Sequence, residues 1–156
     1  MNIEKILKNV PEKSGENKNT TSLKWKKDLI EFLQGKKLDK CLEIGTCHGQ
    51  TTKILADIFN EVWTVEFNFN RLNKAKSICQ DKSNINFIQG DAYNENTYVN
   101  FPKYFDLAII DCIHEYNNVI QDINQSLKFI DKKIYLAFDR DWETLHKYFH
   151  YMHHLE

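Results

Sequence analysis

Short apolar segments alternate with longer polar–apolar segments along most of the chain. Each apolar segment is five or six residues long, carries β-branched or aromatic side chains in much of its length and is bounded by polar turn residues. These properties are typical of strands that are buried on both faces of a sheet. The predicted strands are 40–44, 62–66, 85–89, 106–111 and 133–138.

The segments between the strands have apolar side chains three and four residues apart, which predicts amphipathic helices. A first helix begins near Ser22, which can cap it, and stops at Gly35. The remaining predicted helices are 50–59, 70–80 and 117–130. Strands and helices that alternate in this order form a parallel sheet with right-handed crossovers, so we expect an α/β fold with helices on both faces of the sheet.

The 156 residues are enough for one domain. Residues 11–21 combine Pro, Gly, Ser, Asn and charged side chains without apolar periodicity, so we expect 1–21 to be a mobile lead-in. The single folded domain is predicted to span 22–154. The final pair, 155–156, has the Leu-Glu sequence typical of a cloning remnant and carries no functional argument.

Charge and composition exclude several function classes. The chain has 21 Lys and Arg against 22 Asp and Glu, and residues 41–156 are acidic, so nucleic acid is not an expected partner. The longest apolar run, 107–110, is far shorter than a membrane span, and the N-terminus lacks the apolar core of a signal peptide, so we expect no membrane partner and a cytoplasmic location. The four cysteines lack the spacing of a zinc site and are predicted to be small buried side chains.

Acidic side chains stand at or beside the carboxyl ends of the predicted strands, where open parallel sheets bind ligands. Partly buried acids that repel one another reduce stability unless a ligand or a cation compensates them. A ligand site is therefore expected at this edge of the sheet. The acids are Glu43, Glu66, Asp91, Asp111 and Asp139.

The turn after the first strand contains two glycines, Gly45 and Gly49, just before a helix. Glycine permits a tight turn and a close approach of the backbone to a ligand, and the start of a helix offers N–H groups to an anion. Cys47 stands where a dinucleotide fingerprint has its middle glycine, which weakens a pyrophosphate interpretation. The acid at Glu43 instead suits a ligand that carries an ammonium group.

Three motifs occur in a fixed order, LEIGTCHGQTT at 42–52, GDAY at 90–93 and IIDCIHEY at 109–116. With them the chain resembles the class I S-adenosylmethionine-dependent methyltransferases over roughly 22–140, and the form of its glycine loop resembles the small-molecule O-methyltransferase branch. The resemblance implies a three-layer Rossmann-like sheet of about five strands in the order 3-2-1-4-5. It also implies S-adenosyl-L-methionine as cofactor and the hydroxyl of a small molecule as methyl acceptor.

The resemblance also implies roles for individual residues around the cofactor. Glu66 would accept hydrogen bonds from both ribose hydroxyls, and Asp91 would accept one from the adenine amino group. The Ala92 amide would approach the adenine ring. The methionine part would be surrounded by Glu43, which is placed near the amino group, and by Gly45, Thr46 and Gly49.

For the reaction, the resemblance implies His114 as the base that deprotonates the acceptor and Asp111 as its neighbour in the catalytic site. Related enzymes often bind a divalent cation such as Mg²⁺ after the fourth and fifth strands, where Asp111 and Asp139 match. Arg140, however, stands where a second acid is common, so a metal-independent site remains open. The alternatives to a methyltransferase are a non-catalytic S-adenosylmethionine-binding module and an NAD(P)-dependent Rossmann oxidoreductase.

Relatives of this family commonly add a final antiparallel pair of strands, which the chain is expected to lack. The segment 133–138 would then be an apolar edge strand. Because unpaired edges promote association, we expect a homodimer that uses 133–138 or the helix beside it.

Overall fold

A computed structural model describes residues 2–8, 10, 21–111 and 116–138 of the chain. His114, Asp139 and Arg140 therefore lie outside the described residues, as do 11–20, most of the predicted lead-in. In chain order the elements are α1 (Ile3–Leu7), α2 (Leu23–Leu33), β1 (Lys40–Ile44), α3 (Gln50–Ile58), β2 (Glu61–Glu66), α4 (Phe69–Ile78), β3 (Ile85–Gln89), the short 3₁₀ helix η2 (Glu95–Tyr98), β4 (Phe105–Ile110), α5 (Tyr116–Leu127) and β5 (Ile130–Phe138).

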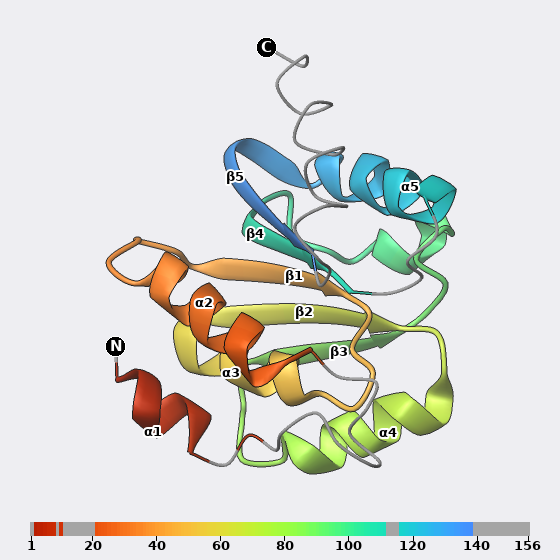
Figure 1. Ribbon diagram of the computed structural model, residues 1–156. Helices are drawn as coiled ribbons and strands as arrows, with labels where there is room; N and C mark the ends of the chain where they lie inside the picture. Colours follow the sequence, from red (N-terminus) through yellow and green to blue (C-terminus); the bar gives the residue numbers. More distant parts are fainter. Residues whose placement is uncertain (1, 9, 11–20, 112–115, 139–156) are drawn as a thin grey trace.

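The strands form one parallel sheet in the order β3-β2-β1-β4-β5, which confirms the predicted fold class and strand order. Figure 1 shows β1 in the middle of the sheet, with α2 and α3 over it and α5 beside β4 and β5. Since β1 pairs with both β2 and β4, the loop that follows it lies between the two halves of the sheet. The expected absence of a final antiparallel pair concerns residues beyond 138, outside the described part of the chain.

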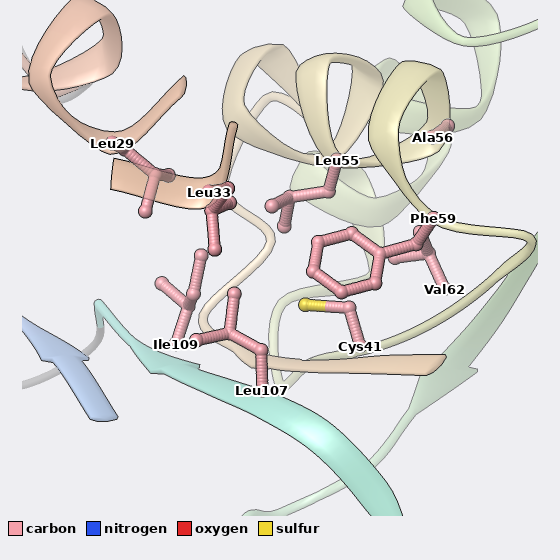
Figure 2. Packing of buried hydrophobic residues seen from close by; sticks show 9 residues of the cluster. All are labelled: Leu29, Leu33, Cys41, Leu55, Ala56, Phe59, Val62, Leu107 and Ile109. Carbon is pink, nitrogen blue, oxygen red and sulfur yellow. The ribbon is translucent and has the colours of Figure 1, made fainter. Parts of the chain in front are cut away.

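The two faces of the sheet are buried by different elements. On one face, side chains of α2 and α3 pack on alternate positions of β1 and β4, and Figure 2 shows this cluster around Cys41, Leu107 and Ile109. On the other face, Leu42, Ile44 and Ala108 are buried with Phe105 in a second cluster. Burial on both faces explains why the strands are short continuous apolar segments rather than alternating ones.

Two boundaries differ from the prediction. The helix expected over 117–130 ends at Leu127, because the amides of Lys128 and Phe129 turn back to the carbonyls of Gln125 and Ser126. Ile130 then begins β5, where it pairs with Phe105, three residues before the predicted start of this strand. An isoleucine fits the apolar stripe of a helix and a buried strand equally well, so periodicity alone cannot separate the two.

A short helix, α1, lies inside the segment expected to be a mobile lead-in. The side chain of Asn2 caps it by accepting from the amide of Lys5, and α1 contacts α2 and α3. Of the cysteines, Cys41 and Cys79 are buried and Cys47 is half-buried, all as free thiols, whereas Cys112 lies outside the described residues.

Helices α3 and α4 approach closely at Gly49, the residue before α3. Gly49 has a left-handed backbone with φ of 78°, and a Cβ placed there would lie 2.8 Å from the Cβ and 2.9 Å from the Cα of Ala75 in α4. A side chain at this position would therefore combine backbone strain with a collision against backbone that cannot move aside.

We expect Gly49→Ala to lower the free energy of unfolding by about 3 kcal/mol, from backbone strain plus overpacking. Gly35→Ala is the matched control, because Gly35 has the same φ of 78° but nothing within 4 Å of its added Cβ. The control should lose only about 1 kcal/mol, the strain alone. Urea unfolding of both variants measures the difference, and equal losses would show that the contact with Ala75 is unimportant.

Candidate active site

Four loops meet at the carboxyl edge of the sheet and are joined there by backbone hydrogen bonds. The Gly45 amide donates to the Val65 carbonyl at 3.0 Å, and the Gly90 amide donates to the Glu66 carbonyl at 3.1 Å. The Asp111 amide donates to the Ile44 carbonyl at 2.8 Å. The structure thus brings together the glycine loop, the end of β2, the GDAY turn and the start of the segment after β4.

The glycine loop (45–49) has a left-handed backbone at three of its five positions, namely Gly45, Cys47 and Gly49. Cys47 is not a glycine, so its φ of 49° costs about 1 kcal/mol. The Cys47 amide donates to Oε2 of Glu66 at 2.8 Å, a charge-assisted bond that offsets this strain. The loop is therefore fixed by the acid at the end of the neighbouring strand.

Glu66 is buried, and both of its carboxylate oxygens accept backbone hydrogen bonds. In addition to the bond from Cys47, Oε1 accepts from the amide of Asn68 at 2.9 Å. Each carboxylate oxygen has two lone pairs, so each retains one for a further donor. Glu66 is thus an oriented acceptor at the edge of the sheet.

The turn after β3 places Asp91 on the surface and Ala92 partly inside. Oδ1 of Asp91 accepts from the amide of Tyr93 at 2.9 Å, as expected of a turn-forming Asp. The Ala92 carbonyl accepts from the hydroxyl of Tyr98 at 2.9 Å, and Ala92 packs against the second hydrophobic cluster. The helix η2 therefore fixes this turn through the hydrogen bond from Tyr98 to Ala92, and the Asp91 carboxylate remains exposed.

Glu43 lies below the glycine loop, with only 1% of its surface exposed. Its Oε2 accepts from the hydroxyl of Thr52 at 2.5 Å and from that of Thr64 at 2.6 Å. Burial raises the pKa of Glu43 to about 7, although the two hydroxyls and the distant charge of Lys26 act in the opposite direction. Glu43 is therefore a buried carboxyl group that titrates near neutral pH, unlike an acid on the surface.

Sequence reasoning missed Lys26, which is fully buried in α2 and donates from Nζ to the carbonyl of Thr21 at 2.5 Å. The signal is present in the sequence, because Lys26 is three and seven residues before Leu29 and Leu33 and so lies on the apolar stripe of the helix. Two buried threonines that donate to Glu43, Thr52 and Thr64, were missed as well, as was the buried hydroxyl pair of Thr21 and Thr51.

The two residues predicted to act in catalysis and the predicted pair of metal ligands are only partly described. Asp111 is half-buried at the end of β4, and its predicted partners His114 and Asp139 lie outside the described residues. Within the ranges that the structure describes, no three His, Cys, Asp or Glu side chains lie close enough to bind a metal ion. None of the described helices has the length and hydropathy needed to cross a membrane.

The free energy of unfolding should depend on pH because Glu43 titrates at a higher pH in the folded state than in the unfolded state. Between the pKa of a free glutamate and about 7, the folded state keeps a proton that the unfolded state has lost, so stability should fall as pH rises through this window. We expect a loss of about 2 kcal/mol between pH 5 and pH 8 from this residue. Glu43→Gln should remove that part of the slope in urea unfolding at both pH values. A wild-type slope that persists unchanged in the variant would assign the titration to another group.

Comparison with known proteins identifies the family of this chain. The family described as "Methyltransferase domain" matches residues 42–140. The ribosomal RNA small subunit methyltransferase A of Buchnera aphidicola (subspecies Schizaphis graminum) is 26% identical, over 65% of this chain and 42% of its own length. This chain therefore spans less than half of that relative.

Solved structures share the fold at low identity. A precorrin-8w decarboxylase of Methanobacterium thermoautotrophicum superposes with a TM-score of 0.70 at 15% identity, covering 87% of this chain and 73% of its own. The fibrillarin of Aeropyrum pernix, solved with natively bound S-adenosyl-L-methionine, gives a TM-score of 0.59 at 22% identity, covering 66% and 46%. The matched region contains the glycine loop, Glu66, the GDAY turn and Asp111, and the chain belongs to the methyltransferase domain family.

Proposed function

We propose that this chain binds S-adenosyl-L-methionine at the carboxyl edge of its sheet and transfers the methyl group to an acceptor. The observation that carries the proposal is the convergence of the glycine loop, Glu66 and the GDAY turn through direct hydrogen bonds. Membership of the methyltransferase domain family supports the same activity. An NAD(P)-dependent oxidoreductase is the weaker alternative, because the strained residue at the centre of the loop is Cys47 rather than glycine.

We assign the cofactor roles from the hydrogen-bonding capacity and the exposure of each residue. Glu66 has one spare lone pair on each oxygen, which suits two vicinal ribose hydroxyls. Asp91 presents an exposed carboxylate for the adenine amino group, and Ala92 lies beside it for the ring. Gly45, Thr46 and Gly49 would accommodate the methionine part.

We expect Glu66→Ala to weaken S-adenosylhomocysteine binding by about 1–3 kcal/mol, roughly tenfold to hundredfold, because the ribose hydroxyls lose a charged acceptor. Asp57→Ala is the control, since it removes an acid that pairs with Lys82 at the far end of α3. Titration calorimetry of both variants measures the effect. Tighter binding of NAD than of S-adenosylhomocysteine by the wild-type chain would reject the proposal.

For catalysis, the sulfonium of the bound cofactor supplies an activated methyl group, so the chain must align the acceptor and remove its proton. We assign the proton to His114, which follows β4 by four residues and precedes α5 by two. With the cofactor bound in the proposed site, its methyl group would be supplied to the acceptor oxygen, and His114 would take the hydroxyl proton of the acceptor. Asp111, at the end of β4, would position this base or the acceptor.

His114→Ala should reduce turnover by about 10² or more while leaving the affinity for S-adenosylhomocysteine nearly unchanged. The measurement is methyl transfer from labelled cofactor to a panel of phenols and other small hydroxyl compounds, beside binding by calorimetry. A variant that retains full activity would show that another group is the base. A wild-type chain that binds cofactor but methylates nothing would favour the non-catalytic binding module.

The chemical class of the methyl acceptor is a separate proposal. We propose a small-molecule hydroxyl because the glycine loop resembles that branch and because residues 41–156 are acidic, which opposes a polyanionic acceptor. The relative from Buchnera is named for ribosomal RNA, so RNA belongs in the same assay as a competing acceptor.

A divalent cation such as Mg²⁺ would lower the pKa of an acceptor hydroxyl. Asp111 and Asp139 are its proposed ligands, since Ile110 pairs with Phe138 and each acid is the next residue in sequence. Turnover by wild type and Asp139→Ala, with magnesium and with chelator, tests the cation. Activity that is indifferent to chelator would favour Arg140 as the source of positive charge.

We also propose a homodimer formed through β5 or the helix that the sequence predicts beside it, because β5 is at one edge of the described sheet. Sedimentation should give a dimer at ~100 μM, a concentration well above the dissociation constant of an interface of standard size. A monomer at that concentration would exclude this assembly.

A further inference from the structure

A chain of hydroxyl groups leads from the buried carboxylate of Glu43 to the glycine loop. Thr64 donates its only hydroxyl proton to Oε2 of Glu43 at 2.6 Å. The hydroxyl oxygens of Thr46 and Thr64 are 2.5 Å apart. While Glu43 is ionised and Thr64 donates its proton to it, Thr46 is the donor in this second bond. Both hydroxyls therefore direct their protons toward Glu43 and their oxygens toward the loop.

The second bond to Glu43 comes from outside this chain of hydroxyls. Thr52, in the first turn of α3, donates to the same Oε2 at 2.5 Å but is not connected to Thr46 through Thr64. Thr46 itself is inside the loop, where its carbonyl accepts from the Gly49 amide at 2.9 Å. Both threonines thus donate to the same carboxylate oxygen, but only Thr64 connects it to the glycine loop. This difference makes them a matched pair for experiment.

Several charged and titratable groups face Glu43 from the elements packed around it. Lys26 from α2 stabilises its ionised form, and Glu66 at the end of β2 destabilises it. The thiols of Cys41 on β1 and Cys79 after α4 also feel its charge, and burial raises the pKa of both, so they stay neutral. The ionised form of Glu43 is thus stabilised mainly by the hydroxyls of Thr52 and Thr64, with a smaller contribution from Lys26.

We propose that Glu43 recognises the ammonium group of the cofactor without touching it, as a positioning residue that orients the hydroxyls of Thr64 and Thr46 beneath the glycine loop. This rests on the proposed function, since it concerns the amino-acid end of S-adenosylmethionine. With Glu43 ionised, the negative ends of both hydroxyl dipoles face the loop, which favours a cationic group there. With Glu43 protonated, the carboxyl group can donate to Thr64 and reverse both hydroxyls, which removes that preference.

The proposal predicts a pH dependence of binding with a definite sign. Since burial raises the pKa of Glu43 to about 7, the carboxylate is ionised above that pH and protonated below it. Affinity for a ligand with an ammonium group should therefore fall as the pH is lowered through about 7. Affinity for a ligand that has the adenosine part but no amino-acid end should not change.

The experiment is titration calorimetry of S-adenosylhomocysteine and of 5′-methylthioadenosine, which lacks the amino-acid end, between pH 5.5 and pH 8.5. For the wild type we expect the first ligand to bind about tenfold more weakly at pH 6 than at pH 8. Glu43→Gln should bind it about tenfold more weakly at pH 8 and without the step near 7. The amino group of the ligand titrates identically with both proteins, so the difference between the two profiles isolates Glu43.

Two further variants separate the hydroxyl chain from a general effect of burial. Thr64→Val interrupts the chain and should weaken S-adenosylhomocysteine at pH 8 as Glu43→Gln does. Thr52→Val is the matched control: it should keep the affinity at high pH and move the step upward, because the lost hydrogen bond favoured the ionised carboxylate. In all variants the affinity for 5′-methylthioadenosine should equal that of the wild type.

The outcomes that overturn this inference differ from those that overturn the proposed function. A pH profile for S-adenosylhomocysteine that is the same in wild type and Glu43→Gln would reject the role of Glu43. Equal losses in Thr64→Val and Thr52→Val would reject the hydroxyl chain. Failure of the wild type to bind either ligand would reject the cofactor site itself. If Glu43→Gln does not fold, the two threonine variants decide the question.

Discussion

The structure depends on one buried carboxylate between the central strand and the helices that cover it. Glu43 lies where α2, β1 and α3 meet, and its two hydroxyl donors come from α3 and β2. Burying a carboxyl group without such donors would cost several kcal/mol. This polar contact therefore helps to fix α3 against the sheet, and with it the end of the glycine loop.

The topology of the sheet determines which chemical groups can meet. In the order β3-β2-β1-β4-β5, the chain leaves β1 toward β2 on one side and returns to β4 on the other. The proposed ligand site lies at this point of reversal, as is usual for open parallel sheets. Glu66 and Asp111 thus flank the same loop although 45 positions of sequence numbering separate them.

The sequence was sufficient for the fold, and the predicted residues of the glycine loop, the end of β2, the GDAY turn and Asp111 do lie at one edge of the sheet. Strand boundaries from β1 to β4 agreed to within a residue or so, because strands buried on both faces are apolar throughout and end in polar turns. The end of α5 was misplaced because Ile130 suits a helix stripe and a strand equally. The threonine partners of Glu43 were not predictable, since a threonine at a strand or helix position gives no sign of which oxygen it meets across the core.

Sequence and structure also differ in what they reveal about Glu43. Its place in the glycine motif predicted a position near the amino group of the ligand, and the structure adds that the side chain is almost fully buried. Lys26 also differs from expectation. A lysine on the apolar stripe of a helix is expected to extend its ammonium group to water, yet the ammonium group of Lys26 donates to a backbone carbonyl inside the protein. A motif identifies residue types, and only packing decides which of them reach the surface.

The partial burial of the Cys47 side chain has a consequence for how the site resists chemical modification. Burial raises the pKa of the Cys47 thiol, which outweighs the opposing effect of Arg71. The thiolate is the form that reacts with oxidants and electrophiles, and little of it forms at neutral pH when the pKa is raised. A cysteine can therefore occupy the centre of this loop without making it a target for oxidation or alkylation.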